Sequence, residues 1–185
     1  MKRIFIGIRV EAENNFKKLI ASLKEDLKDD NLKWTPFENI HITLAFLGDT
    51  PMEKIEAISD MLISKCADKV RFEIRLEGFG IFRSLHDPKV LWAGIYQSEK
   101  LEVLQASVVE GLKEIGIAVE DRPFSPHLSI ARIKHIRDKD NLKVLLLKYH
   151  DTDIQKVQVK EVILYESVLR QEGPVYNPLM VVRLS

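Results

Sequence analysis

The sequence has almost no cysteine and no excess of charge of either sign. Cys66 is the only cysteine in 185 residues, so an intramolecular disulfide is excluded, as expected of a reducing intracellular compartment. Lysine plus arginine and aspartate plus glutamate both total 28. A chain without net positive charge has no global field to gather long nucleic acids by counterion release. A general DNA or RNA binder is therefore disfavoured, whereas an enzyme that grips a terminal phosphate with a few arginines is not.

Long hydrophobic runs are missing as well. No stretch approaches the roughly 20 apolar residues that span a bilayer, and the apolar run after Lys2 and Arg3 is too short for a signal peptide. The hydrophobic content of 45% is enough for a packed core. These features predict a cytoplasmic protein with no membrane association, and the lack of a low-complexity linker predicts that residues 1–185 form one domain.

Hydrophobic periodicity predicts a mixture of strands and helices. Strands are predicted over residues 4–10, 40–47, 70–77, 90–96, 154–159, 161–169 and 179–184. Helices are predicted over residues 16–27, 55–66, 101–115 and 142–149. Gly48 predicts a turn, Gly78-Phe79-Gly80 predicts a bend, and Thr50-Pro51-Met52-Glu53 predicts a capped helix start. Because alternating strands need one solvated face, an α+β fold is favoured over a parallel doubly wound sheet.

One short pattern occurs twice, as His41-Ile42-Thr43-Leu44 and as His127-Leu128-Ser129-Ile130. Side chains alternate between the two faces of a strand, so each copy places its histidine and hydroxyl on one face and its apolar residues on the other. A proline-containing segment precedes each copy, and the copies lie almost half a chain apart. This duplication favours a catalytic pair over two chance core histidines. We expect two pseudo-symmetric lobes whose motifs face each other.

Two histidines on opposite sides of a phosphate suit displacement at phosphorus. The attacking and leaving oxygens lie on opposite sides of the phosphorus atom, so one group must act as base and the other as acid. Histidine serves either role near neutral pH, because its ordinary pKa is about 6.5. The hydroxyls of Thr43 and Ser129 would donate hydrogen bonds to the non-bridging oxygens. Such a site needs no metal and no cofactor.

The surroundings of both motifs resemble the 2H phosphoesterases. The similar segments are Glu38–Gly48, Val90–Gly94 and Arg122–Arg132, within a resemblance that runs from Arg3 to Tyr176. Within that superfamily the sequence is most similar to bacterial and archaeal RNA 2′,3′-cyclic phosphodiesterases, historically called 2′-5′ RNA ligases. The resemblance implies a bilobal α+β fold, with two pseudo-symmetric antiparallel-sheet lobes and outer helices around a central cleft.

The same resemblance implies roles for six residues. His41 and His127 would be the catalytic pair, and Thr43 and Ser129 would hold the phosphate; the family more often has threonine where Ser129 stands. Arg132 would be a further phosphate ligand. Phe46 would be the surface on which the terminal base stacks. Phe46 and Arg132 each lie five residues after a histidine, so a regular strand would turn them away from it. A bulge, a strong twist or a strand end is therefore required.

The implied reaction opens a 2′,3′-cyclic phosphate at an RNA 3′ end and leaves a 2′-phosphate. Run in reverse with an RNA 5′-hydroxyl, it would form a 2′-5′ linkage without ATP. The partners would then be RNA 3′ ends or small cyclic-phosphate nucleotides, with no obligate protein partner. The alternatives are a 2H enzyme for small cyclic nucleotides or ADP-ribose cyclic phosphate, and a non-catalytic module that binds RNA ends. Trp92 is interpreted as core, whereas Tyr176 is left as core or cleft lining.

Overall fold

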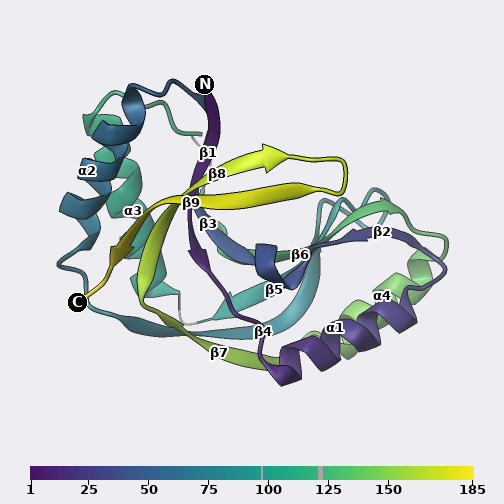
Figure 1. Ribbon diagram of the computed structural model, residues 1–185. Helices are drawn as coiled ribbons and strands as arrows, with labels where there is room; N and C mark the ends of the chain where they lie inside the picture. The colour runs from purple at the N-terminus through teal and green to yellow at the C-terminus, as the bar shows by residue number, and fades with distance from the viewer. Residues whose placement is uncertain (97, 121–122) are drawn as a thin grey trace.

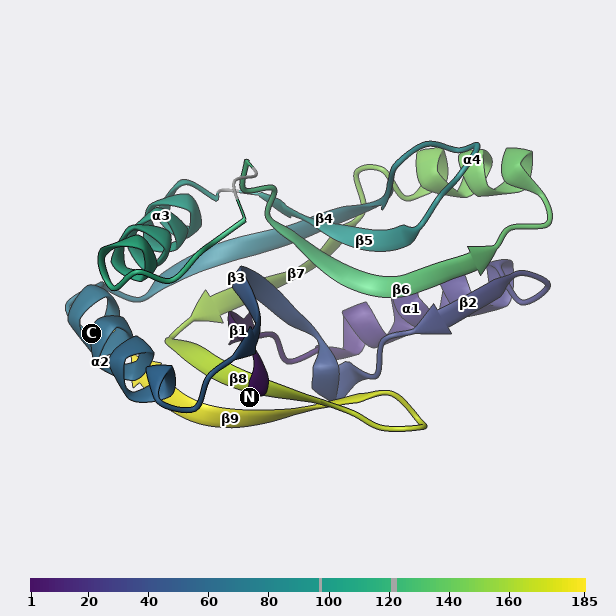
Figure 2. The ribbon, with the colours of Figure 1, turned by 90° about the horizontal axis from the view of Figure 1, so that it is seen from above.

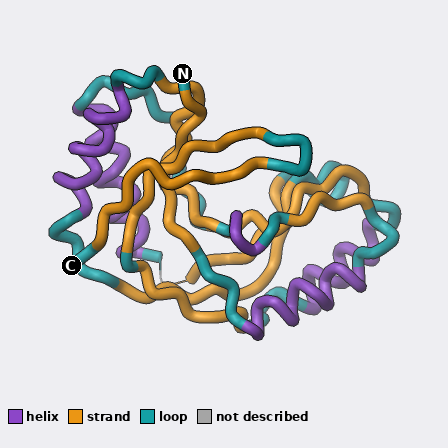
Figure 3. The backbone as a smooth tube through the Cα atoms, viewed as in Figure 1, coloured by secondary structure: helices purple, strands orange, loops and turns teal. Residues whose placement is uncertain are grey.

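The computed structural model describes residues 1–96, 98–120 and 123–185 as two antiparallel sheets with helices (Figures 1 and 3). The strands are β1 (Lys2–Arg9), β2 (Asn31–Trp34), β3 (His41–Thr50), β4 (Phe72–Phe82), β5 (Val90–Tyr96), β6 (His127–His135), β7 (Asp153–Val159), β8 (Glu161–Leu169) and β9 (Pro174–Arg183). The helices are α1 (Asn14–Asp26), α2 (Lys54–Cys66), α3 (Glu99–Glu114) and α4 (Lys139–Lys148), with a 3₁₀ turn at Phe37–Asn39. The predicted α+β class is confirmed. Arg122, which was predicted to lie in an extended approach to the second motif, lies outside the described residues.

Each motif strand belongs to a different sheet. The four-stranded sheet has the order β3-β1-β8-β9, and the five-stranded sheet has the order β2-β6-β5-β4-β7. All neighbouring strands are antiparallel. Figure 2 shows helices α2 and α3 at one end of the molecule and α1 and α4 at the other. The first motif therefore lies on an edge strand, β3, and the second on an interior strand, β6.

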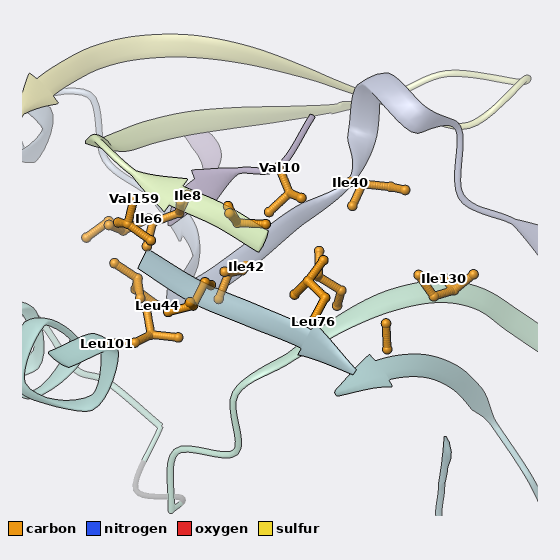
Figure 4. Packing of buried hydrophobic residues seen from close by; sticks show 14 of the residues in the cluster. Ile6, Ile8, Val10, Ile40, Ile42, Leu44, Leu76, Leu101, Ile130 and Val159 are labelled. Atoms are coloured by element: carbon orange, nitrogen blue, oxygen red, sulfur yellow. The ribbon is translucent and has the colours of Figure 1, made fainter. Parts of the chain in front are cut away.

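The hydrophobic core joins the two sheets. Ile6, Ile42 and Leu44 from the four-stranded sheet pack in one cluster with Leu76 and Ile130 from the five-stranded sheet (Figure 4). Each such side chain contributes about 1.5–3 kcal/mol relative to exposure. Because side chains alternate along a strand, burial of these residues leaves the opposite face of both motif strands outside the core.

Two predicted strand breaks, at Gly48 and at Gly78, are absent. The strands continue through both glycines, with irregular pairing nearby. β4 continues through Gly78, which has a φ of +71°, and the pairing with β5 shifts register between Glu77 and Phe79. A Cβ at Gly78 would lie 2.1 Å from the carbonyl oxygen of His150, so this close approach requires glycine. β3 likewise continues through Gly48 to Thr50, and the predictions of a bend and a turn were wrong.

The predicted capping box at Thr50 was also wrong. Helix α2 begins at Lys54 with Glu53 at its N-cap, and no side chain caps it. The Thr50 hydroxyl instead donates to the carbonyl oxygen of Gly48. Val70, predicted to open a half-buried strand, precedes β4 and is 71% exposed.

The described part of the chain contains no helix that is both long enough and apolar enough to cross a membrane.

Candidate active site

A bulge follows the first motif histidine in β3. His41, Ile42 and Thr43 pair regularly with Arg9, Ile8 and Gly7 of β1. The register then shifts, so that Leu44 is passed over and Ala45 pairs with Ile6. Leu44 and Ala45 are consecutive buried residues, and the next residue, Phe46, is exposed. The bulge thus inverts the alternation, and Phe46 lies on the face of the sheet that carries His41 and Thr43.

The second motif has its bulge at the matching position of β6. His127, Leu128 and Ser129 pair with Gly94, Ala93 and Trp92 of β5. The register then passes over Ile130, so that Ala131 pairs with Leu91. Ile130 and Ala131 are both buried, and Arg132 is exposed. Arg132 therefore lies on the face of His127 and Ser129, as the resemblance requires and as a regular strand would forbid.

The two motif histidines are held by the same hydrogen bond. The Nδ1 atom of His41 lies 2.7 Å from the carbonyl oxygen of Asn39, and that of His127 lies 2.7 Å from the carbonyl oxygen of Ser125. A carbonyl oxygen can only accept, so each Nδ1 carries the hydrogen and donates. The Nε2 atom of each ring is left to exchange a proton with a ligand.

Aromatic rings surround His41. Its ring centroid lies 4.7 Å from that of Phe5 and 5.0 Å from that of Tyr176, which meets it edge-on. Gly7 of β1 lies opposite Thr43, and its lack of a side chain allows β1 to lie close to this ring. A Cβ at Gly7 would lie 2.7 Å from the carbonyl oxygen of Ile42. Burial lowers the pKa of His41, the hydrogen bond to Asn39 partly opposes that effect, and the charge of His127 lowers the pKa further. His41 is therefore predominantly neutral at pH 7.

Among the described residues, His127 packs against one aromatic ring. The ring of Phe82 meets it edge-on at a centroid distance of 4.5 Å, and Phe82 in turn lies 5.8 Å from the ring of Trp92. Trp92 pairs directly with Ser129, and opposite residues of an antiparallel pair share a face. The interpretation of Trp92 as a core residue was wrong, because it lies on the face that carries the second motif.

Charged groups from both sheets meet around Tyr176 of β9. Burial raises the pKa of the Tyr176 hydroxyl, while the nearby positive charges of Arg132 and Arg3 lower it. Arg132 comes from the five-stranded sheet and Arg3 from the four-stranded sheet. The guanidinium carbon of Arg3 lies 5.1 Å from the centroid of the Phe46 ring. Tyr176, left open by the sequence, thus lies beside the first motif histidine and near Arg132 of the other sheet.

Sequence reasoning missed three members of this cluster, Arg3, Phe5 and Phe82. The available signal was the alternation in β1. Arg3, Phe5 and Gly7 share one face of this strand, and the core residues between them occupy the other face. Phe82 had no comparable signal, because it follows the bulge at Gly78 and its direction depends on that irregularity. Among the described residues, no three histidine, cysteine or acidic side chains gather closely enough to hold a metal ion.

The comparison with family models decides the relationship. The model of the 2′-5′ RNA ligase superfamily matches residues 9–169. The chain belongs to this superfamily. The resemblance inferred from the two motifs is therefore confirmed.

Two curated proteins are similar to this superfamily member along almost its whole chain. The RNA 2′,3′-cyclic phosphodiesterase of Methanocaldococcus jannaschii is 34% identical over 175 residues, which cover 95% of this chain and 96% of that protein. The protein of the same name from Archaeoglobus fulgidus is 32% identical over 179 residues, covering 97% of this chain and 98% of its own length.

Solved structures show that this superfamily member also shares their fold. A protein of Thermus thermophilus superimposes with a TM-score of 0.79 at 22% identity, covering 98% of this chain and 97% of its own. E. coli LigT in its apo form has a TM-score of 0.74 at 22% identity, covering all of this chain and 98% of its own. The arrangement of two sheets is thus common to proteins whose sequences have diverged widely.

Proposed function

We propose that this protein hydrolyses the 2′,3′-cyclic phosphate at an RNA 3′ end to a 2′-phosphate. The observation that carries the proposal is the matched pair of histidines, each anchored through Nδ1 and each with a hydroxyl residue two positions later. The relatives named RNA 2′,3′-cyclic phosphodiesterase support the same substrate. The continuous core supports one domain over residues 1–185.

The two Nε2 atoms carry the proton transfers in this proposal. One accepts the proton of the attacking water, and the other donates a proton to the ribose O3′ as its bond to phosphorus breaks. The products are a 2′-phosphate monoester and a free 3′-hydroxyl, so the atoms and charges balance without a metal or cofactor. In the reverse direction, an RNA 5′-hydroxyl attacks in place of water and forms a 2′-5′ linkage. Water at high concentration favours hydrolysis.

Three further side chains bind the phosphate. Thr43 and Ser129 donate from opposite sheets to the non-bridging oxygens, where negative charge develops. Arg132, brought to the same face by the bulge at Ile130, adds a guanidinium with two parallel donors. Phe46 offers its exposed face to the terminal base. A solved complex of E. coli LigT with 3′-AMP supports a nucleotide ligand for this fold.

The test uses a short RNA that ends in a 2′,3′-cyclic phosphate, incubated with purified protein in EDTA. The expected product carries a 2′-phosphate, identified by its mobility and by resistance to an enzyme specific for 3′-phosphates. A 3′-phosphate would contradict the proposed regiochemistry. Unchanged RNA together with turnover of ADP-ribose cyclic phosphate would identify a different substrate, and tight binding without any turnover would identify a module that binds RNA ends.

A further inference from the structure

A hollow extends along the sheet beyond His41. Its volume is about 650 Å³, and strands β1, β8 and β9 line it. The lining includes Arg9, Tyr165 and Arg183, and volumes of this size accommodate nucleotide-sized ligands. None of the roles inferred from the two motifs uses this region.

The hollow and His41 lie on the same face of the four-stranded sheet. Arg9 of β1 pairs directly with His41 of β3, and opposite residues of an antiparallel pair share a face. The ring of Tyr165, which lines the hollow, has its centroid 6.5 Å from that of His41. A ligand that enters the catalytic site can therefore continue into the hollow without leaving the sheet.

The floor of the hollow is apolar, and its charged lining residues carry a net positive charge. Ile163 and Val181 form a cross-strand pair on the floor, and Val181 is 43% exposed although its partner is buried. Arg183 of β9 lies opposite Glu161 of β8 in the strand pairing. Two arginines and one glutamate give the lining a net charge of +1.

The two arginines that line the hollow form no ion pairs with described carboxylates. Within the described ranges, neither Arg9 nor Arg183 has a carboxylate oxygen within ion-pair distance. The charge of Arg9 instead acts on the nearby Tyr165 hydroxyl, where it lowers a pKa that burial raises. Exposed guanidinium groups next to an aromatic ring and an apolar floor match the chemistry of a single-stranded nucleic acid, which combines phosphates with stacking bases.

We propose that this hollow binds the nucleotide that precedes the cyclic phosphate, with its internucleotide phosphate against Arg9 and Arg183 and its base over Ile163 and Val181. The proposal rests on the function proposed above and deepens it, because it assigns a binding site within this protein to the nucleotide before the terminal one. Neutral overall charge is consistent with this role, since local arginines supply the cationic contact.

The test compares two substrates, adenosine 2′,3′-cyclic phosphate and a dinucleotide with the same terminal group. The dinucleotide has the internucleotide phosphate that the mononucleotide lacks. We expect kcat/KM of the wild-type protein to be higher for the dinucleotide. In Arg183→Gln, the ratio of the two kcat/KM values falls about tenfold, as expected for loss of a hydrogen-bonded charge pair. Arg183→Lys retains the charge and restores most of the ratio.

A matched control and a second measurement separate this effect from general damage. Arg137→Gln removes an exposed arginine from the turn between β6 and α4 and keeps the wild-type ratio. Binding of the 2′-phosphorylated dinucleotide product is then measured against salt concentration. Loss of one phosphate contact in Arg183→Gln reduces the magnitude of the negative slope of log affinity against log salt by about 0.7.

Two outcomes overturn the proposal, and both differ from failure of the proposed function. One is equal kcat/KM of the wild-type protein for the two substrates. The other is an unchanged ratio and salt slope in Arg183→Gln. In both cases the protein still opens the cyclic phosphate. If the proposed function itself is wrong, the wild-type protein turns over neither substrate.

Discussion

His41 and His127 belong to different sheets, yet each donates its Nδ1 hydrogen to the carbonyl oxygen two residues earlier, at 2.7 Å in both cases. The intervening residue is Ile40 in one motif and Pro126 in the other. The two imidazoles are thus fixed in the same tautomer. The Nε2 atoms take no part in these two hydrogen bonds, and the charge of His127 lowers the pKa of His41.

Replacement of either motif histidine should stop turnover without unfolding the protein. We expect His41→Ala and His127→Ala each to lower kcat by roughly 10²–10⁴-fold, the range for loss of a general acid or base. The measurement is hydrolysis of an RNA cyclic phosphate, with circular dichroism as the check on folding. His135→Ala, an exposed histidine at the end of the same strand as His127, is the control and keeps the wild-type rate. Wild-type turnover in either motif variant would refute the mechanism.

The pKa of His41 should lie below its ordinary value of about 6.5. Burial is the main cause, and the charge of His127 adds to it. The substitution His127→Ala removes the second effect and should move the pKa of His41 upward, although not to 6.5. Titration of the imidazole resonances by NMR measures both values. A His41 pKa above 6.5 in the wild-type protein would contradict the structure.

Protonation of His41 should also cost stability. Its pKa is lower in the folded protein than in the unfolded chain, so the unfolded chain binds the proton more readily. The free energy of unfolding therefore falls as the pH drops from about 6.5 toward the lower pKa of the folded state, and this loss disappears in His41→Gln. Urea unfolding at several pH values measures it. An identical pH dependence in both proteins would count against this assignment.

Gly7 should tolerate no side chain. A Cβ there would lie 2.7 Å from the carbonyl oxygen of Ile42, next to His41. We expect Gly7→Ala to lower the free energy of unfolding by about 1–3 kcal/mol, the usual cost of overpacking. Because β3 must shift to make room, kcat should fall as well. Chemical denaturation and steady-state kinetics measure the two effects, and wild-type values for both would show that the close approach is unimportant.

Phe46 should contribute to substrate binding through stacking. Its ring is 41% exposed, and Arg3 lies over it. We expect Phe46→Ala to weaken RNA binding by about 1–3 kcal/mol, the range for loss of one stacked base, and Phe46→Trp to retain it. Leu147→Ala, which removes a side chain that is 69% exposed on α4, is the control. Equal KM values for Phe46→Ala and this control would remove Phe46 from the site.

The sequence was most informative where the period of the pattern was regular. In the motif tetrapeptides, alternation was enough to predict which residues enter the core and which share a face with the histidines. It failed at irregular positions. Gly78 was interpreted as a bend, because a glycine in a bulge and a glycine in a turn have the same local signature. Thr50 was interpreted as part of a capping box, but β3 extends to Thr50 and its hydroxyl donates to the carbonyl oxygen of Gly48.

By itself, the sequence determined the fold class, the family and the two motifs, because these depend on residue types and short-range periodicity. Only the tertiary structure decided that Phe46 and Arg132 join the histidines. Each depends on a bulge at the fourth motif residue, Leu44 or Ile130, where strand pairing passes over one residue. Only the packing of strands far apart in the chain placed Tyr176 beside His41 and opened the hollow toward Arg183. Such long-range pairing leaves no local trace in the sequence, since it is fixed by the fit of whole sheets around one core.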